Sequence, residues 1–362
     1  MSPGTDEIAA RLLAYLSAHL QRTDLAYAEP PESISGGLDT AIFGFALADA
    51  PPEARGRLIL RLGREGSYPP RFALEAMTQN ALAEMGYPVP RALLVETATA
   101  PLGGPFIVMQ RVGGRPLGQQ GAASFAAGTS VVTRLVNLAR LPGALGGISR
   151  TWVETQVRLH RLPPEPLLRA AAAAGVDARL LTFDGQLARL AATIEDVGPS
   201  ALTPAVSWLQ ANRPDDGRAV SICHGDFHPL NIMADGGIVT GVIDWANVAI
   251  AAPELDVASA VTNIATLPIK VPAAMRLPVR LLIAGVLRRY VAAYRQLRPL
   301  DAASLRYYQV FRAMVQLRPA AATLVTGLKG SGAFHSPAGI RNLITHIHAH
   351  GGPKLQLELP EG

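Results

Sequence analysis

The sequence has little of what marks secreted or membrane-spanning proteins. It contains one cysteine, Cys223, in 362 residues, which excludes an intrachain disulfide and favours a reducing compartment. Mean hydropathy is high at +0.21, yet no apolar run reaches the roughly 18 residues that a membrane span needs. The first residues, MSPGTDEIAA, lack a basic segment followed by an apolar one, so we expect no signal peptide. Together these absences predict a cytoplasmic protein with no membrane partner.

Strong charge and aromatic richness are missing as well. The net charge is +5 and aromatic residues make up 6% of the chain, which argues against a nucleic-acid-binding groove. A modest positive charge still permits attraction of anions such as nucleotides. With 49% hydrophobic and 17% charged residues, the composition is that of a globular protein. The length allows two domains, or one domain of two lobes, and no repeat of fixed period is present.

The spacing of apolar residues predicts an α+β protein. A helix is expected over residues 6–20 and another over 71–86, with strands at 41–48, 57–63, 91–98 and 105–112. The proline-containing segment AEPPESIS is assigned no strand. We therefore expect a small lobe with an antiparallel sheet, residues 1–112, and a large, mainly helical lobe, residues 113–362. Helices of the large lobe are predicted at 121–140, 148–161, 166–174, 185–195, 202–212, 254–262, 273–296 and 302–328. The histidine-rich tail, His346, His348 and His350, is expected to be a solvated strand.

One short segment, HGDFHPLNIMADGGIVTGVID, concentrates the polar residues that phosphoryl transfer needs. Asp226 lies in a predicted loop, where its carboxylate can accept or align a substrate hydroxyl. The turn ADGG between two apolar runs predicts a hairpin, which would bring Asn231 and Asp244 near each other. Their amide and carboxylate oxygens suit Mg²⁺. The segment indicates the reaction centre of an ATP- or GTP-dependent phosphotransferase.

HGDFHPLN followed by VIDW resembles the catalytic loop and metal-binding strand of the aminoglycoside/choline kinase-like phosphotransferases. That family has a two-lobed, protein-kinase-like fold, which the resemblance therefore implies here. On this resemblance Asp226 and His228 are the catalytic candidates, and Asn231 and Asp244 are the magnesium ligands. Leu159-His160 and the element Pro253–Asp256 also match, so that the resemblance runs from about residue 30 to residue 262.

The same resemblance implies a nucleotide site, for ATP or GTP, in the first lobe. Ser35, Gly36 and Gly37 stand where the family covers the phosphates, and Glu75 matches its helix glutamate. The family's lysine is replaced by Arg61, whose planar fork can still pair with Glu75 and donate to phosphates. The hinge that meets the nucleotide base corresponds to Met109, Gln110 and Val112.

Two other functions stay open. A metal-dependent hydrolase could use Cys223, His224, Asp226 and His228 as a clustered site, with the tail histidines added to it. A non-catalytic member of the same fold would bind nucleotide without transferring phosphate. In the main interpretation, by contrast, His224 is a structural histidine under the loop. Asp256 is then a brace for the loop backbone.

The acceptor is predicted less sharply than the chemistry. Asp301 is the only acid between residues 257 and 350, a region rich in arginine. This imbalance disfavours a polycationic aminoglycoside and favours a neutral or anionic alcohol. The predicted function is transfer of the γ-phosphate of a nucleoside triphosphate to a hydroxyl of a small molecule, either a metabolite or an antibiotic-like compound. An antibiotic acceptor would make this a resistance enzyme, and we expect a monomer or homodimer.

Overall fold

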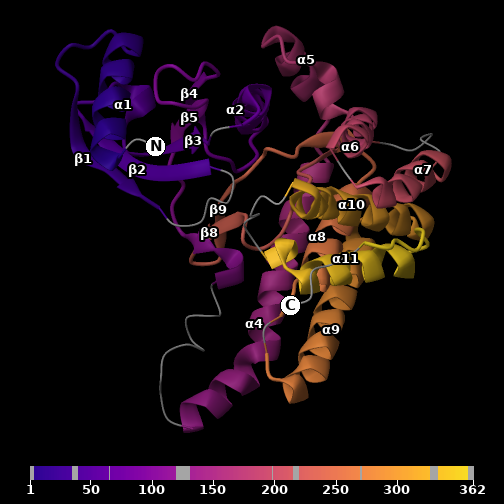
Figure 1. Ribbon diagram of the computed structural model, residues 1–362. Helices are drawn as coiled ribbons and strands as arrows, with labels where there is room; N and C mark the ends of the chain where they lie inside the picture. Colours follow the sequence, from indigo (N-terminus) through magenta and orange to yellow (C-terminus); the bar gives the residue numbers. More distant parts are fainter. Residues whose placement is uncertain are drawn as a thin grey trace. The chain divides into compact units, whose positions relative to one another are not determined.

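The computed structural model describes residues 4–34, 40–64, 66–119, 131–197, 199–214, 220–269, 271–326 and 333–357 (Figure 1). The chain divides into two compact units, each assembled from three segments. The first comprises Met1–Arg115, Glu165–Ala178 and Ile232–Ala246. The second comprises Pro116–Pro164, Arg179–Asn231 and Asn247–Gly362. The expected lobe boundary after residue 112 stays a prediction.

A five-stranded antiparallel sheet forms the framework of the first unit, in the order β1-β2-β3-β5-β4. The strands are β1 (Ala26–Ser33), β2 (Thr40–Ala48), β3 (Arg57–Gly63), β4 (Ala92–Glu96) and β5 (Phe106–Gln110). The four strands predicted from alternation are confirmed, but β1 was missed. Its Pro30 and Pro31 lack backbone N–H groups, which an edge strand tolerates, and the pairing register shifts between Glu29 and Glu32.

The two faces of this sheet carry different partners because side chains alternate along a strand. Leu58, Leu60 and Leu62 of β3 share a buried cluster with apolar residues of α1 (Thr5–His19). The opposite face packs against α2 (Pro69–Glu84), where Ile59 of β3 contacts a second cluster. Arg61 is two residues from Ile59 and so lies on the same face of the strand, which directs its guanidinium toward α2.

A hairpin and one further helix complete the first unit. α5 (Glu165–Ala173) packs against α2. β8 (Ile232–Asp235) and β9 (Ile238–Val242) form the hairpin predicted from ADGG, and Asp235 pairs with Ile238 across a two-residue turn. Gly236 and Gly237 both have positive φ, +54° and +85°, as this kind of hairpin turn requires. β6 (Arg115–Pro116) is the third strand of this small sheet.

The second unit is mainly helical. Its helices are α4 (Val131–His160), α6 (Phe183–Val197), α7 (Thr203–Ala211), α8 (Glu254–Thr266), α9 (Ala273–Leu297), α10 (Ala302–Thr326) and α11 (Pro337–Ala349). The short strands β7 (Ser221–Cys223) and β10 (Ala249–Ala251) pair antiparallel. α8, α10 and α11 pack side by side (Figure 1). Helix α4 is continuous to His160, where two separate helices were predicted at 121–140 and 148–161, and residues 121–130 of the first prediction lie outside the described residues.

The expectation of a solvated strand at the histidine-rich tail was wrong. This segment is α11, which begins after Ser336, whose hydroxyl accepts from the Gly339 N–H at 3.1 Å. Its apolar residues recur at helical spacing and are buried, and His346 is buried with them against Thr262, at 3.1 Å. Ser336 and Pro337 are typical of the start of a helix, and the apolar residues that follow recur with the helical period of 3.6. This pattern favours a helix despite the nearby glycines.

The architecture confirms the predicted fold class: a small antiparallel sheet and a mainly helical remainder. None of the helices in the described residues is both long and apolar enough to cross a bilayer.

Candidate functional site

The loop from His224 to Asn231 leaves β7 in the second unit and is fixed by α8. The backbone N–H groups of His224 and Gly225 donate to the Asp256 carboxylate, at 2.8 and 2.6 Å. The Ser259 hydroxyl donates to the Gly225 carbonyl at 2.8 Å. Gly225 has φ +80°, and a Cβ there would lie 2.0 Å from the carbonyl oxygen of Asn247. The loop therefore requires glycine, and Asp256 braces its backbone as the sequence predicted.

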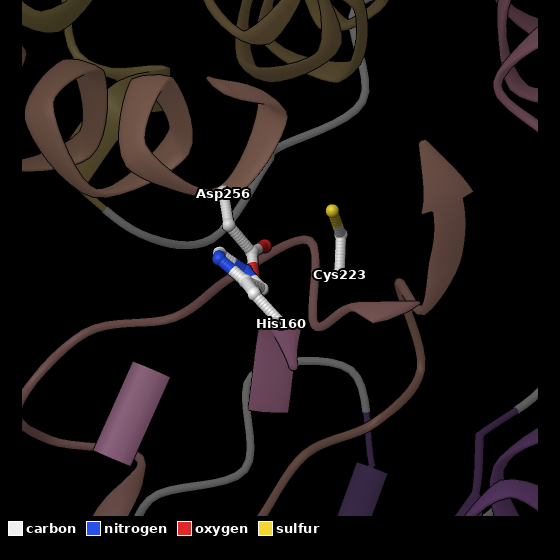
Figure 2. A group of neighbouring side chains, drawn as sticks. All are labelled: His160, Cys223 and Asp256. Atoms are coloured by element: carbon white, nitrogen blue, oxygen red, sulfur yellow. The ribbon is translucent and has the colours of Figure 1, made fainter. Parts of the chain in front are cut away.

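Asp256 also belongs to a buried cluster with His160 and Cys223 (Figure 2). The potential metal-ligand atoms of these three side chains all lie within 4.8 Å of one another. The His160 ring uses both nitrogens, one 3.0 Å from Asp256 Oδ2 and one 2.6 Å from the Tyr294 hydroxyl. Burial raises the pKa of the Cys223 thiol, which faces backbone carbonyls of residues 251 and 252. With its donors and acceptors engaged in this way, the cluster supports the loop.

The four-residue set of the hydrolase interpretation, Cys223, His224, Asp226 and His228, is not brought together as one group. Among the described residues, the His160 cluster is the group with spacing suited to a metal. His224 is fully buried, packs edge-on against Phe227, and accepts from the Asp226 N–H at 3.2 Å. It thus has the structural position expected of it.

Asp226 is held by side chains from two helices that the sequence did not single out. Its Oδ1 accepts from Asn263 Nδ2 of α8 at 2.5 Å and from Arg312 Nη2 of α10 at 2.9 Å. Its Oδ2 lies 3.6 Å from His228 Nε2. Burial opposes ionisation, but the charge of Arg312 and the His228 contact outweigh it and hold the pKa of Asp226 well below its usual range. Asp226 is therefore a fixed carboxylate.

Asn231 lies at the end of the same loop and is 8% exposed. Its Nδ2 donates to the Asp226 carbonyl at 3.0 Å and lies 3.4 Å from His228 Nε2. Its backbone N–H donates to the His228 carbonyl at 2.9 Å. The amide nitrogen of Asn231 is therefore engaged with the loop. The structure thus brings Asp226, His228 and Asn231 together.

The first unit holds a second constellation, in which Arg61 bridges two carboxylates. Arg61 Nη1 lies 2.5 Å from Glu75 Oε1 and 3.1 Å from Asp244 Oδ1. The Glu75 side chain is 3% exposed, whereas that of Asp244 is 39% exposed. Burial opposes the charge of Arg61, but the Glu75 and Asp244 carboxylates raise its pKa above the usual value. Burial raises the pKa of Glu75 against the opposing effect of Arg61.

Asp244 follows β9 in an unusual backbone conformation. Its φ is +69°, which is uncommon for a residue other than glycine and is best tolerated by Asn and Asp. The flanking chain is anchored: Trp245 Nε1 donates to the Val242 carbonyl at 2.8 Å, and Arg71 Nε donates to the Ala246 carbonyl at 3.1 Å. This anchored turn presents the Asp244 carboxylate on the side where Arg61 lies.

The predicted hinge residues lie at the end of β5 and just beyond it. Met109 is buried and paired within the sheet, and the Gln110 N–H donates to the Arg91 carbonyl at 2.9 Å. Val112 packs so closely on β9 that a Cβ at Gly241 would come within 2.8 Å of it. The segment is therefore fixed against the β8–β9 hairpin.

Some predicted site residues are not joined by the described structure. Ser35, Gly36 and Gly37 lie outside the described residues. Asn231 belongs to the second unit and Asp244 to the first, so their shared magnesium site stays a prediction. Asn263 and Arg312 gave no sequence signal: Asn263 is one of several polar residues in α8, and Arg312 is one of many arginines.

Comparison with known proteins places these constellations in a family. The sequence model of the phosphotransferase enzyme family matches residues 51–300. Acyl-CoA dehydrogenase family member 11 of Homo sapiens is 28% identical over 209 residues, and its counterpart from Pongo abelii is 27% identical over 208. Each alignment covers 55% of this chain but only 24% of the relative, so the chain spans about a quarter of those proteins.

Solved structures share the fold at low sequence identity. A protein of Ralstonia eutropha JMP134 described as an aminoglycoside phosphotransferase superimposes with a TM-score of 0.58 at 17% identity, covering 94% of this chain and 98% of its own. A thermostable mutant of aminoglycoside phosphotransferase APH(4)-Ia, in ternary complex with ADP and hygromycin B, gives 0.56 at 14%, covering 94% and 99%. Macrolide 2′-phosphotransferase type I gives 0.52 at 17%, covering 99% and 100%.

The family match extends over more than half of the chain and includes both constellations, the Arg61–Glu75–Asp244 group and the Asp226 loop. The chain therefore belongs to the phosphotransferase enzyme family and has the protein-kinase-like α+β fold of the aminoglycoside and macrolide phosphotransferases.

Proposed function

We propose that this protein transfers the γ-phosphate of a nucleoside triphosphate to a hydroxyl group of a small molecule. The observation that supports this most is the state of Asp226, an ionised carboxylate on a rigid loop within a phosphotransferase fold. Such a carboxylate accepts a hydrogen bond from the acceptor hydroxyl and aligns its oxygen for attack on the γ-phosphorus. In phosphoryl transfer most of the catalysis comes from such positioning and from neutralisation of charge.

The nucleotide is assigned to the first unit. Arg61, oriented by Glu75, donates to phosphate oxygens, and the segment from Met109 to Val112 meets the base through its backbone. The family resemblance assigns Ser35, Gly36 and Gly37, which lie outside the described residues, to the phosphates. ADP in one structural relative supports nucleotide use, and ATP and GTP are both compatible with backbone recognition of the base.

The donor atoms of Asn231 and Asp244 fit magnesium. Asn231 has its amide nitrogen bound to the loop, which leaves a neutral oxygen as a ligand, and Asp244 offers a partly exposed carboxylate. We assign one Mg²⁺ ligand to each. When bound, the metal supplies neutralisation of phosphate charge. Asp244→Asn should abolish transfer in a chain that stays folded, and retained turnover would refute this assignment.

For the acceptor we propose a neutral or anionic alcohol. The helical region from residue 257 to 350 has a single acid, Asp301, which is occupied in the structure. α9 instead carries exposed arginines, among them Arg276, Arg280 and Arg288. A polycationic aminoglycoside would lack carboxylate partners there. The Asp226 carboxylate is already paired with Arg312, so its negative charge is not available to bind a cationic acceptor.

The direct test is a screen of hydroxyl compounds for nucleoside-diphosphate release. It should include aminoglycosides, macrolides, nucleosides and small hydroxy acids, with the isosteric Asp226→Asn and the truncating Asp226→Ala run beside the wild type. We expect release with a neutral or anionic alcohol and a loss of roughly a hundredfold or more in both variants, with nucleotide binding kept. Loss of nucleotide binding in Asp226→Asn would make Asp226 structural, and a preference for aminoglycosides would refute the charge argument.

A second candidate function is nucleotide binding without transfer. The observation in its favour is that Arg61 already pairs with Asp244, a carboxylate that a metal would need. Titration of a fluorescent nucleotide with and without Mg²⁺ separates the two functions. Binding that tightens with Mg²⁺ and is lost from Asp244→Asn supports the kinase, whereas metal-independent binding with no product in the screen supports the non-catalytic protein.

A further inference from the structure

Asp226 is bound asymmetrically, and the asymmetry distinguishes its two oxygens. Oδ1 accepts two short hydrogen bonds, from Asn263 Nδ2 at 2.5 Å and from Arg312 Nη2 at 2.9 Å. Oδ2 has His228 Nε2 at 3.6 Å, which is longer than a hydrogen bond. One oxygen is thus occupied by α8 and α10, and the other faces the side of the loop where His228 lies.

The two donors are themselves fixed by a small network. Asn263 Oδ1 accepts from Arg312 Nε at 3.2 Å and from Gln316 Nε2 at 3.1 Å. Two donors on the amide oxygen leave only one orientation of that amide, with its nitrogen toward Asp226. Arg312 and Gln316 are four residues apart on α10, so that one face of the helix holds Asn263.

Arg312 is suited to this task by its shape as well as by its charge. The guanidinium donates from Nε to Asn263 and from Nη2 to Asp226, and the residue is 6% exposed. A planar fork can make both bonds at once, whereas a lysine ammonium presents a single point of attachment. A buried guanidinium would be costly unless paired, which ties its position to that of Asp226.

Given the phosphotransfer proposed above, we infer that Asn263 and Arg312 are positioning residues that reserve Asp226 Oδ1 and leave Oδ2 for the acceptor hydroxyl. The hydroxyl oxygen attacks the γ-phosphorus, and the bond between that phosphorus and the β–γ bridging oxygen breaks. The nucleoside diphosphate leaves with the electron pair. The hydroxyl proton passes to Asp226 Oδ2 and from there to solvent.

Substitutions at Asn263 separate positioning from packing. Asn263→Asp keeps the shape of the side chain but replaces the donor by a second carboxylate oxygen facing Asp226, whereas Asn263→Ala leaves a small gap. If Asn263 positions Asp226, kcat falls further in Asn263→Asp than in Asn263→Ala, by roughly tenfold, while the KM for the nucleotide stays within about twofold. If Asn263 only fills space, the order is reversed, and that result overturns the inference.

Substitutions at Arg312 test the fork. Arg312→Gln keeps a planar donor without charge, and Arg312→Lys keeps the charge without the fork. We expect a loss in kcat of roughly a hundredfold for Arg312→Gln and a smaller loss for Arg312→Lys, again with an unchanged KM for the nucleotide. Arg306→Gln is the matched control, because Arg306 is exposed on the same helix, and it should retain wild-type kcat. Equal kcat in Arg312→Gln and the control overturns the inference.

A third measurement does not depend on catalysis. In a double-mutant cycle of Asp226→Asn and Arg312→Gln, the urea midpoint should fall on replacing Arg312 in the wild type but change much less in the Asp226→Asn background. If Asp226 and Arg312 are coupled in this cycle but no acceptor yields a phosphorylated product, the proposed function fails while the Asp226–Arg312 contact is confirmed. Product formation without coupling and without the kcat losses means that the positioning role fails. Should Arg312→Gln not fold, the order of the two Asn263 variants decides alone.

Discussion

His346 gives a quantitative prediction about stability and pH. It lies in α11, is 9% exposed, and has its Nε2 3.1 Å from the Thr262 hydroxyl of α8. Burial, with a smaller contribution from His350, lowers the pKa of His346 from 6.5 to about 3. Between these two values the unfolded chain binds a proton at this position and the folded protein does not. The stability that depends on a neutral His346 is therefore fully present above about pH 6.5 and is lost progressively as the pH falls toward 3.

The magnitude follows from the distance between the two pKa values. At pH 5 the unfolded-state pKa lies about 1.5 units above the solution pH, and each unit corresponds to about 1.36 kcal/mol. The wild type should lose about 2 kcal/mol of unfolding free energy between pH 7.5 and pH 5 because of His346. His346→Gln cannot titrate and should lose that much less over the same interval, whatever its stability at pH 7.5.

Urea titrations followed by far-UV circular dichroism at the two pH values measure this difference. His348→Gln is the matched control, since His348 is exposed on the same helix, and it should behave as the wild type does. His350, whose pKa is also lowered by burial, is present in all three proteins. Parallel losses in the wild type and His346→Gln would refute the reasoning, because the folded protein would then accept a proton at His346 without cost.

Three further predictions concern the loop and the ion pair. Gly225→Ala should abolish transfer with circular dichroism retained, because its Cβ would meet the Asn247 carbonyl at 2.0 Å; activity at the wild-type level would contradict the glycine requirement. Asp256→Asn weakens the hydrogen bonds to two backbone N–H groups and should lower the unfolding free energy by about 2 kcal/mol in urea. An unchanged urea midpoint would show that Asp256 does not brace the loop. Glu75→Ala leaves Arg61 short of a buried partner and should cost roughly 3 kcal/mol in thermal unfolding. Glu84→Ala, exposed on the same helix, is its control and should cost little.

Much of the fold was predictable because local patterns agree with the tertiary structure. Strands β2 to β5 alternate or are apolar throughout, and Asp235–Ile238 has the two glycines that its turn needs. The Arg61–Glu75 pair followed from a resemblance and is consistent with the parity of β3. β1 and α11 were missed for opposite reasons. Prolines concealed the edge strand, and flanking glycines and histidines concealed a helix whose apolar residues recur every three to four positions.

The contacts of Asp226 could not be predicted for a physical reason. Asn263 is 37 residues and Arg312 86 residues beyond Asp226 in the chain. Their approach depends on the packing of α8 against α10, which no local pattern specifies. Arginine is abundant in this part of the chain, and most arginines on helices face solvent, so composition could not separate Arg312 from its neighbours. Only the burial of its side chain marks it.

The proline pair in β1 bears on how this protein behaves at high concentration. β1 is one of the two outer strands of the sheet, and most of its residues are exposed. An outer strand with a regular row of N–H groups is a template on which another chain can add. Pro30 and Pro31 have no N–H group, so the row is interrupted at this pair, and the pairing register with β2 shifts between Glu29 and Glu32. The same residues that concealed the strand in the sequence thus act as a guard against strand-by-strand aggregation, and replacing both with β-branched residues would expose that liability.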